Sequence, residues 1–394
     1  MSASLPLHPP SPAEPFEQFL GDLAALGVRP VASGGTAYGM MKARTNARWW
    51  LMPLGAGRVS SASIAMYQPA SAIARAARLG IRAALRAGLT CGWSSGRIRF
   101  DRSPRLPDGV LPDLAMCAYF TGTAGPHRKT AIQFMDAGGG ILGYAKLSRN
   151  SLVVPFLSHE ARMLGRLDGM RLRSADVPKL LVFHGFEGDA PSLLVTDSRK
   201  EAGTYSPMDP RPEHLRFLAE LASRTGSRGA LNAGGELLRL ARDNRLPTAW
   251  RHRFERGLDE LRASLPKLPL ALAHGDFTPW NSFVRGERLY VFDWEYASED
   301  LPLGYDLTHY VLAARGAADP VGTAGQLIAW MGNTFPEHDS ATRHALVLLS
   351  LLLHAGFYLC RAAECQGDAL HWADGGVRGR LIDVLLDNGG ALAC

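Results

Sequence analysis

The chain has few of the features that mark secreted, metal-binding or membrane-spanning proteins. Its 394 residues include only five cysteines: Cys91, Cys117, Cys360, Cys365 and Cys394. None of them forms a Cys-x-x-Cys pair, and an odd count without regular spacing argues against a disulfide framework. The N-terminus also lacks the basic-then-apolar pattern of a secretory signal. We therefore expect reduced thiols and a cytoplasmic location.

Long apolar runs are scarce as well. The longest, from Ala345 to Cys360, is interrupted by His354 and is shorter than the roughly 20 residues that span a bilayer. We expect no transmembrane segment and interpret this run as a buried helix. With 46% hydrophobic residues the chain can form sizeable cores, and its length predicts more than one domain.

Charge is unevenly distributed along the chain. The formal net charge is +6, with the basic excess in residues 1–110 and a mild acidic excess in residues 205–394. Four arginines would share one helical face: Arg75, Arg78, Arg82 and Arg86. Such a helix could touch a membrane surface or an acidic partner, but its small apolar face, without Trp or Phe, favours a solvated polar face. No nucleic-acid motif accompanies these residues, so we do not expect nucleic acid as a partner.

Residues 274–295 contain the groups that phosphoryl transfer requires. The tripeptide HGD ends at Asp276, Asn281 follows five residues later, and Asp293 lies twelve residues further on. The kinase sequence H-R-D-x-x-x-x-N has the same gap between Asp and Asn, and a metal-binding Asp follows it. Asp276 can orient and deprotonate a hydroxyl, while Asn281 and Asp293 can bind Mg²⁺ through oxygen.

The local pattern predicts that these side chains meet. An apolar run over residues 268–273 predicts a buried strand before HGD. Two short apolar runs, 281–284 and 289–292, predict a hairpin with Gly286 at a positive φ. A hairpin would place the amide and the second carboxylate side by side. A surface turn rich in Asp and Asn is the alternative, but the combined spacing favours a catalytic loop.

At these residues the chain resembles the aminoglycoside phosphotransferase and choline kinase family, small-molecule relatives of protein kinases. The resemblance rests on HGD through Asn281, on Phe-Asp-Trp-Glu around Asp293 and on Gly-Tyr-Asp-Leu around Asp306. It extends over roughly residues 111–394. It implies that Asp276 is the catalytic base and that Asn281 and Asp293 are the Mg²⁺ ligands. It also implies that Asp306 holds the catalytic loop.

The preceding part of the chain predicts a nucleotide-binding half. A strand, a glycine turn with Gly122 and Gly125, and a returning strand could place backbone N–H groups over phosphates, although the turn is not a full GxGxxG. The next strand carries Lys146 in Tyr-Ala-Lys, the position of a phosphate-binding lysine. Glu160 follows fourteen residues later in an expected helix. We predict an ion pair between Lys146 and Glu160.

Two more strands, near residues 180–186 and 192–196, would complete a five-stranded sheet. The resemblance implies that Thr196, Asp197 and Ser198 form a hinge whose backbone pairs with the adenine edge. After the hinge the pattern becomes helical, and the resemblance implies that the acceptor site lies in this α-rich part.

These elements predict an α+β protein with a bilobal, protein-kinase-like fold. We expect a basic N-terminal α/β domain over residues 1–110, a five-stranded antiparallel N-lobe over 111–200 and a mostly helical C-lobe over 201–394. The sequence gives no role for the first domain and no oligomeric state.

The predicted function is an ATP- or GTP-dependent phosphotransferase that moves the γ-phosphate to a hydroxyl of a small molecule, with Mg²⁺ as cofactor. Aminoglycosides, amino alcohols, sugars and nucleosides stay open as acceptors. The alternative is a kinase-like regulator that binds nucleotide, or a partner, without turnover. The imperfect glycine turn favours that alternative, whereas the presence of every expected catalytic side chain favours the enzyme.

Overall fold

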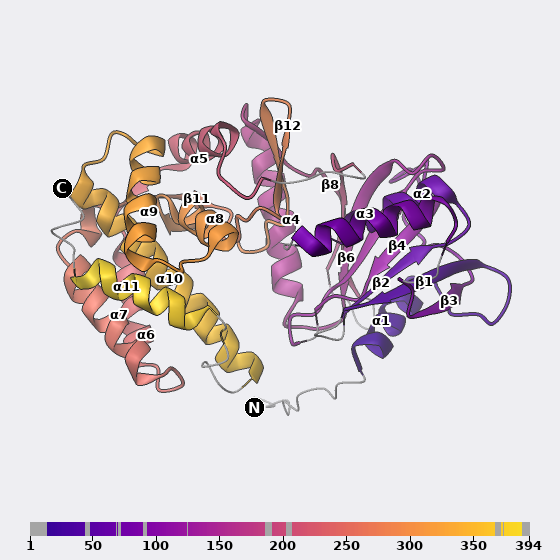
Figure 1. Ribbon diagram of the computed structural model, residues 1–394, viewed down its shortest axis with the longest axis horizontal. Helices are drawn as coiled ribbons and strands as arrows, with labels where there is room; N and C mark the ends of the chain where they lie inside the picture. Colours follow the sequence, from indigo (N-terminus) through magenta and orange to yellow (C-terminus); the bar gives the residue numbers. More distant parts are fainter. Residues whose placement is uncertain are drawn as a thin grey trace. The chain divides into compact units, whose positions relative to one another are not determined.

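One antiparallel sheet organises the N-terminal half of the chain (Figure 1). The computed structural model describes residues 14–43, 48–67, 69, 72–89, 93–123, 125–185, 191–201, 207–366, 372 and 374–387. The chain divides into two units: Met1–Gly169 with Pro178–Thr204, and Met170–Val177 with Tyr205–Cys394. Because the first unit is built on a sheet and the second is mainly helical, the predicted α+β class is confirmed.

The first unit contains eight strands of a single sheet, in the order β3-β1-β2-β4-β5-β6-β9-β8, and each neighbouring pair runs antiparallel. The strands are β1 (Thr36–Lys42), β2 (Trp49–Pro53), β3 (Gly96–Phe100), β4 (Met116–Phe120), β5 (Thr130–Met135), β6 (Ile141–Ser148), β8 (Leu180–His184) and β9 (Ser192–Asp197). The helices are α1 (Glu14–Ala25), α2 (Gly57–Ala62), the short 3-10 helix η1 (Ser63–Met66), α3 (Ala72–Arg86) and α4 (Val154–Met170).

Residues 111–200 contribute the five predicted strands, β4, β5, β6, β8 and β9, and the N-terminal segment adds β1, β2 and β3 to the same sheet. β2 pairs with β4 through Trp50 opposite Phe120 and Leu51 opposite Tyr119. Residues 1–110, expected as a domain of their own, therefore share a sheet with the part that follows. The Pro-Asp-Gly signal at residues 107–109 marks a turn inside this unit. Turn residues look the same in a linker and in a connection between paired strands.

The two faces of the sheet are covered by different helices. On one face, Phe19 and Leu23 of α1 pack on Tyr38, Phe100 and Tyr119 from three strands. The ring of Phe19 lies 6.1 Å from that of Tyr119, edge to face. Because successive side chains of a strand point to opposite faces, alternate residues form a second core on the other side. That core joins β2 to η1 and α3.

Helix α3 corrects the expectation of a solvated arginine face. Its apolar residue Leu85 packs inward as expected, but Arg78 is also half-buried, whereas Ile73 and Leu79 are 85% and 65% exposed. Burial lowers the pKa of Arg78, and the neighbouring charge of Arg82 adds to the effect. The long stem of an arginine can cover apolar surface, so helical spacing alone did not identify the buried side.

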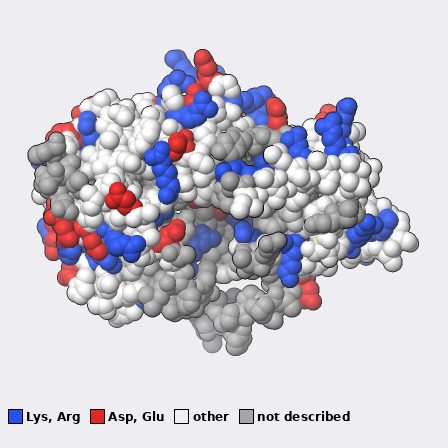
Figure 2. All heavy atoms as spheres, viewed as in Figure 1, with Lys and Arg blue, Asp and Glu red and all other residues white. Residues whose placement is uncertain are grey.

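The orientation of Arg78 on α3 brings its positive charge close to Lys200, beside the sheet. Burial, and then the charge of Arg78, lower the pKa of Lys200 to about 7. The Lys200 ammonium lies 5.8 Å from the ring centre of Tyr144 on β6. On the face of the molecule shown in Figure 2, Lys and Arg side chains are spread among acidic ones and do not form one continuous patch. This distribution gives no support to a basic docking surface on that face.

The second unit is mainly helical. Its helices are α5 (Pro212–Thr225), α6 (Leu231–Arg242), α7 (Thr248–Leu261), the 3-10 helix η2 (Leu265–Lys267), α8 (Tyr305–Arg315), α9 (Pro320–Thr334), α10 (Ser340–Gln366) and α11 (Gly375–Asp387). Its strands are β7 (Ala175–Asp176), β10 (Ser227–Arg228), β11 (Pro269–Ala273), β12 (Ser282–Arg285), β13 (Arg288–Val291) and β14 (Ser298–Pro302). They form two small sheets, β10-β11-β14 and β12-β13-β7.

Helix α10 contains the longest apolar run of the chain. By length and composition alone, residues Ser340–Glu364 could cross a membrane, but 67% of the relevant window is buried inside the protein. Leu346, Leu349 and Leu352 are completely buried. The helix packs against the other helices of its unit, including α8, α9 and α11. These contacts agree with the interpretation of the run as a buried helix.

A fragment of residues 111–394 should not fold stably. The fragment lacks β2, so the edge of β4 would be unpaired and the apolar side chains of Cys117 and Tyr119 would be uncovered. Unpaired apolar edges promote aggregation. Soluble yield and thermal melting of the fragment, measured beside the full chain, test this expectation. A cooperative transition within a few degrees of the full chain would show that the N-terminal segment is an independent domain.

Candidate active site

The predicted catalytic loop follows β11, and a single carboxylate holds it in place. Asp306, in the first turn of α8, accepts the backbone N–H of His274 at 2.6 Å and that of Gly275 at 3.0 Å. Gly275 has a φ of 82°, and a Cβ there would lie 2.1 Å from the carbonyl oxygen of Tyr296. The second position of HGD therefore requires glycine.

His274 is a buried structural residue of this loop. Its Nδ1 accepts the backbone N–H of Asp276 at 3.2 Å, so the proton belongs on Nε2, which lies 2.9 Å from the carbonyl oxygen of Phe292. The ring thus ties the HGD sequence to the chain just before Asp293. These bonds give His274 a structural role in the loop, and Asp276 is the residue predicted to take part in the reaction.

The carboxylate of Asp276 is held on both oxygens. Its Oδ2 accepts a hydrogen bond from Asn281 Nδ2 at 2.8 Å, and its Oδ1 lies 2.9 Å from His309 Nε2. Asp276 is half-buried, whereas Asn281 and His309 are buried. His309 was not predicted from the sequence. It follows Asp306 by three residues on α8, so the i,i+3 spacing was the signal that could have identified it.

The predicted hairpin is present and brings Asn281 and Asp293 to its open end. Ser282 pairs with Val291, the turn residue Gly286 has a φ of 61°, and Phe292 N–H donates to the carbonyl of Asn281 at 3.1 Å. Asp293 itself has a φ of 73°, a conformation that is uncommon outside glycine and costs energy. The backbone is therefore strained at the residue that the sequence proposed as a metal ligand.

The donor atoms at this end of the hairpin fit a magnesium ion. The amide nitrogen of Asn281 donates to Asp276, so its amide oxygen is the atom left to bind a cation. Asp293 adds a carboxylate. Mg²⁺ prefers such hard oxygen ligands and takes few of them from the protein. The assignment of both residues as metal ligands stays a prediction.

Lys146, the predicted phosphate-binding lysine, is held by an ion pair within the first unit. Lys146 of β6 lies 2.6 Å from the carboxylate of Glu160 on α4, so the predicted ion pair is present. The Glu160 side chain is 3% exposed and that of Lys146 is 22% exposed. Tyr144 lies two residues before Lys146 and therefore shares its face of the sheet. Its hydroxyl donates to Gln133 at 3.1 Å.

The glycine turn between β4 and β5 is closed by tight backbone contacts. Gly122 has a φ of 80°, and a Cβ there would lie 2.1 Å from the carbonyl oxygen of Lys129. Gly125 has a φ of 137°, and its carbonyl accepts the N–H of Arg128 at 3.1 Å. Ala124 lies outside the described residues. Both predicted glycines therefore stand at positions where a side chain would strain the turn.

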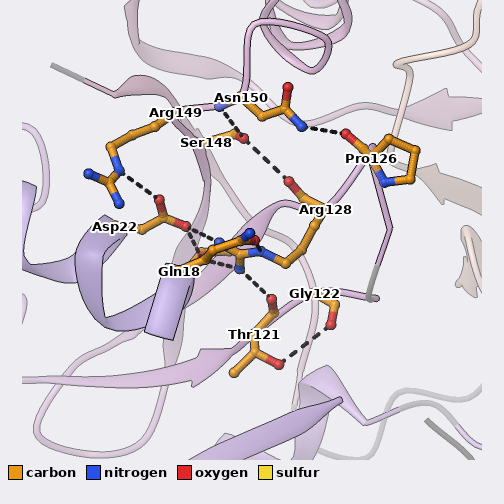
Figure 3. A network of polar contacts seen from close by, with 10 residues as sticks. Gln18, Asp22, Thr121, Gly122, Pro126, Arg128, Ser148, Arg149 and Asn150 are labelled. Carbon is orange, nitrogen blue, oxygen red and sulfur yellow. Dashed lines mark hydrogen bonds and ion pairs between the residues drawn. The ribbon is translucent and has the colours of Figure 1, made fainter. Parts of the chain in front are cut away.

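A buried polar network holds the base of this turn (Figure 3). Arg128 lies 2.6 Å from Asp22 of α1, and the two side chains are 6% and 3% exposed. The other Arg128 guanidinium nitrogen, Nη1, donates to the carbonyl of Thr121 at 2.7 Å. Arg149 reaches Asp22 at 3.3 Å, and Asn150 donates to the carbonyl of Pro126 at 2.6 Å. Helix α1 of the N-terminal segment is thus part of the support of the glycine turn.

Two of the three predicted hinge residues, Thr196 and Asp197, belong to strand β9 of the sheet. Thr196 pairs with Tyr144 on one side and with Leu180 on the other. Asp197 N–H donates to the carbonyl of Lys179 at 3.0 Å, and its carboxylate accepts the Lys179 N–H at 2.6 Å. These bonds argue against the N–H of Asp197 as an adenine contact. Ser198 is the first residue after β9, and its hydroxyl accepts the N–H of Lys200 at 2.9 Å.

Comparison with known proteins assigns the catalytic part to a family. Residues 160–340 match the phosphotransferase enzyme family, a stretch that includes the HGD loop, the hairpin and Asp306. For residues 160–340 the match confirms the resemblance seen in the sequence. No curated protein matches the sequence.

Several solved structures resemble the chain at low identity. A thermostable mutant of the aminoglycoside phosphotransferase APH(4)-Ia, with ADP and hygromycin B, is 15% identical, covers 67% of this chain and 91% of its own, and has a TM-score of 0.45. A GDP complex of an aminoglycoside 2′-phosphotransferase-IIIa mutant is 16% identical over 73% and 96%, with a TM-score of 0.44. A macrolide 2′-phosphotransferase type I is 16% identical over 71% and 91%, also with a TM-score of 0.44. At these TM-scores they give no information about the acceptor of this protein.

Asp22→Asn should destabilise the protein strongly. The change leaves Arg128 charged and buried without its partner, which costs about 3–5 kcal/mol. The free energy of unfolding from urea titration measures the loss. Asp259→Asn is the matched control, because its 2.7 Å pair with Arg262 is exposed and is worth at most about 1 kcal/mol. Equal losses in the two variants would contradict the assigned role of the network.

Asp306→Asn should loosen the catalytic loop. Its amide nitrogen would face one of the two backbone N–H groups, and an unsatisfied buried donor costs about 1–3 kcal/mol. Thermal melting of the variant measures this cost, with the exposed Asp300→Asn as control. An unchanged melting temperature would show that the loop does not depend on this carboxylate.

The same variant should also change how stability depends on pH. Burial raises the pKa of Asp306 to about 7, although its two backbone hydrogen bonds lower it. The unfolded pKa is about 3.9, so the folded chain binds this proton more tightly and loses stability as the pH rises from about 4 to about 7. Replacing the carboxyl by an amide should remove this component of the slope. A slope identical to that of the wild type would contradict the assignment.

Proposed function

We propose that the protein transfers the γ-phosphate of ATP or GTP to a hydroxyl of a small molecule. The observation that carries the proposal is the Asp276 carboxylate, fixed by Asn281 and His309 in a loop that belongs to a phosphotransferase family. Half-burial of Asp276 leaves part of the carboxylate accessible to a substrate. Such an arrangement suits a group that accepts a hydroxyl proton in a defined direction.

The proposed mechanism depends on positioning and charge. Asp276 accepts the hydrogen bond of the acceptor hydroxyl and takes its proton as the oxygen attacks the γ-phosphorus. The hydrogen bond from His309 keeps the carboxylate from rotating, so the attacking oxygen can be aligned with the leaving group. Phosphoryl transfer requires little covalent help from the protein, and alignment together with charge stabilisation supplies most of the rate.

The donor phosphates would be held by two sets of groups. Lys146, oriented by its ion pair with Glu160, would bind the α- and β-phosphates, while the turn at Gly122 and Gly125 would offer backbone N–H groups. Asn281 and Asp293 would hold Mg²⁺, which neutralises charge on the phosphates when bound. Whether ATP or GTP is the donor depends on base contacts near Ser198 in this proposal.

The reduced cysteines support a cytoplasmic setting for this reaction. Cys117 and Cys360 are free thiols within the described residues, and Cys117 is buried. Small hydroxyl compounds and nucleoside triphosphates are the proposed partners. An acidic protein or a membrane surface at the N-terminal segment has little support, because Arg78 of α3 is turned toward the sheet.

Asp276→Asn should abolish most turnover while nucleotide binding persists. The amide cannot accept the hydroxyl proton, and a general base contributes about 10²–10⁴-fold to the rate. The measurement is acceptor-stimulated nucleotide consumption with Mg²⁺, beside nucleotide binding by calorimetry. Asp293→Ala should differ by weakening binding of the Mg²⁺–nucleotide as well.

The exposed Asp300→Asn is a control that should leave both quantities unchanged. Near-normal turnover in Asp276→Asn would exclude it as the base. Tight nucleotide binding without turnover in the wild type, across a broad set of hydroxyl compounds, would instead favour a regulator.

A further inference from the structure

A chain of ring contacts leads away from the Asp276 carboxylate within the second unit. His309 is hydrogen-bonded to Asp276 and packs against His354 of α10, with the two ring centres 4.2 Å apart and the planes tilted by 44°. His354 lies 4.7 Å from Tyr358, and Tyr358 stacks on Trp372 at 5.7 Å with an angle of 7° between the planes. We call these four residues, with Tyr305 and Arg378, the acceptor-side cluster.

Arg378 is the anomalous member of the cluster. The side chain is 6% exposed, yet no hydrogen bond or ion pair joins it to another described residue. Its Nη1 is buried without a partner in the part of the chain that the structure describes. Burial lowers the pKa of Arg378, and a guanidinium keeps its charge even so. A buried charge of this kind is unfavourable unless something pairs with it.

The neighbours of Arg378 supply no anion inside the cluster. Tyr305 and Tyr358 have pKa values raised by burial, so both phenols are neutral. His354 is also neutral, because burial, and then the charges of His309 and Arg378, lower its pKa well below the usual value. Asp374 interacts electrostatically but is exposed and makes no hydrogen bond to the guanidinium. The missing counter-charge must therefore come from outside this cluster.

The cluster lies beside the Asp276 carboxylate, which its member His309 contacts. The charge of Asp276 raises the pKa values of Tyr305 and Tyr358, and the charge of Arg378 lowers both. A second cation, Arg361, lies 5.3 Å from the ring centre of Tyr296 and hydrogen-bonds its hydroxyl. Tyr296 in turn interacts with Asp276 and Asp293. The charges of Arg361 and Arg378 would repel a polycationic acceptor and attract an anionic one.

We infer that the acceptor is a hydroxyl compound with an anionic group, a carboxylate or a phosphate, that pairs with Arg378 while its hydroxyl faces Asp276. The inference rests on the proposed phosphotransferase function. In the reaction, the hydroxyl oxygen forms a bond to the γ-phosphorus, the bond from that phosphorus to the β–γ bridging oxygen breaks, and the hydroxyl proton passes to Asp276. The products are a phosphate monoester and the nucleoside diphosphate.

The test compares acceptors that differ only in charge. Three scaffolds are used, each with neutral and anionic members: glucose with glucuronate and glucose 6-phosphate, adenosine with AMP, and glycerol with glycerate and glycerol phosphate. Glucosamine and ethanolamine serve as cationic members. We expect kcat/KM to be at least about tenfold higher for an anionic member than for its neutral partner, because the anion supplies the counter-charge that the buried Arg378 guanidinium lacks among the described residues. Comparison of the carboxylate with the phosphate identifies the anion.

Two arginine variants separate a ligand role from a structural one. Arg378→Met should reduce the anionic preference to within about twofold, while its melting temperature stays equal or rises, since an apolar side chain replaces an unpaired buried charge. Arg253→Met is the matched control on α7. It removes a 2.7 Å ion pair with Asp383 of α11, so it should lower the melting temperature and keep the anionic preference.

The opposite pattern overturns the inference. Equal or better use of neutral or cationic members in every scaffold contradicts it, and so does an Arg378→Met variant that melts lower but keeps the preference. If no compound stimulates nucleotide consumption, the proposed function fails separately. In that case, ligand-induced stabilisation tests whether Arg378 binds an anion. The measurement is the increase in melting temperature with glucuronate or glucose 6-phosphate, relative to glucose. An increase that Arg378→Met abolishes supports the anion site, and no increase in the wild type excludes it.

Discussion

The two hydrogen bonds that Asp306 accepts from His274 and Gly275 are the contacts on which the rest of the site depends. They fix the loop after β11, and the loop fixes the carboxylate of Asp276. His309 comes from the same helix as Asp306, so one helix both holds the loop and orients Asp276, the proposed base. A shift of α8 would therefore move the support and the base together, which keeps their geometry constant.

The N-terminal segment also holds a loop in place, in the half of the chain that is predicted to bind nucleotide. Its strands extend the sheet, and Asp22 of α1 forms the buried pair with Arg128 under the glycine turn. Glycine is conformationally permissive, so a turn that contains Gly122 and Gly125 needs restraint from its surroundings. In this protein, ion pairing from a distant helix supplies the restraint. The segment thereby acquires a structural role that its basic composition does not suggest.

Local patterns predicted much of the fold and of the catalytic loop. The hairpin followed from two apolar runs around Gly286. The pairing of Lys146 with Glu160 followed from their kinase-like order upstream of the HGD sequence. Long-range features were missed. The pairing of β2 with β4 depends on tertiary packing, and the inward turn of Arg78 depends on which surface covers its stem. That Arg378 Nη1 has no partner among the described residues is visible only in the folded structure.

The central claim is that Asp276 directs a phosphate from a nucleotide to a small hydroxyl compound. Phosphorus-31 NMR of the protein with Mg²⁺, ATP or GTP and a mixture of hydroxyl compounds tests it most directly. The account predicts that the γ-phosphate signal declines while a phosphate-monoester signal grows, and that Asp276→Asn prevents both changes. Release of inorganic phosphate alone, or a monoester signal that persists in Asp276→Asn, would contradict it.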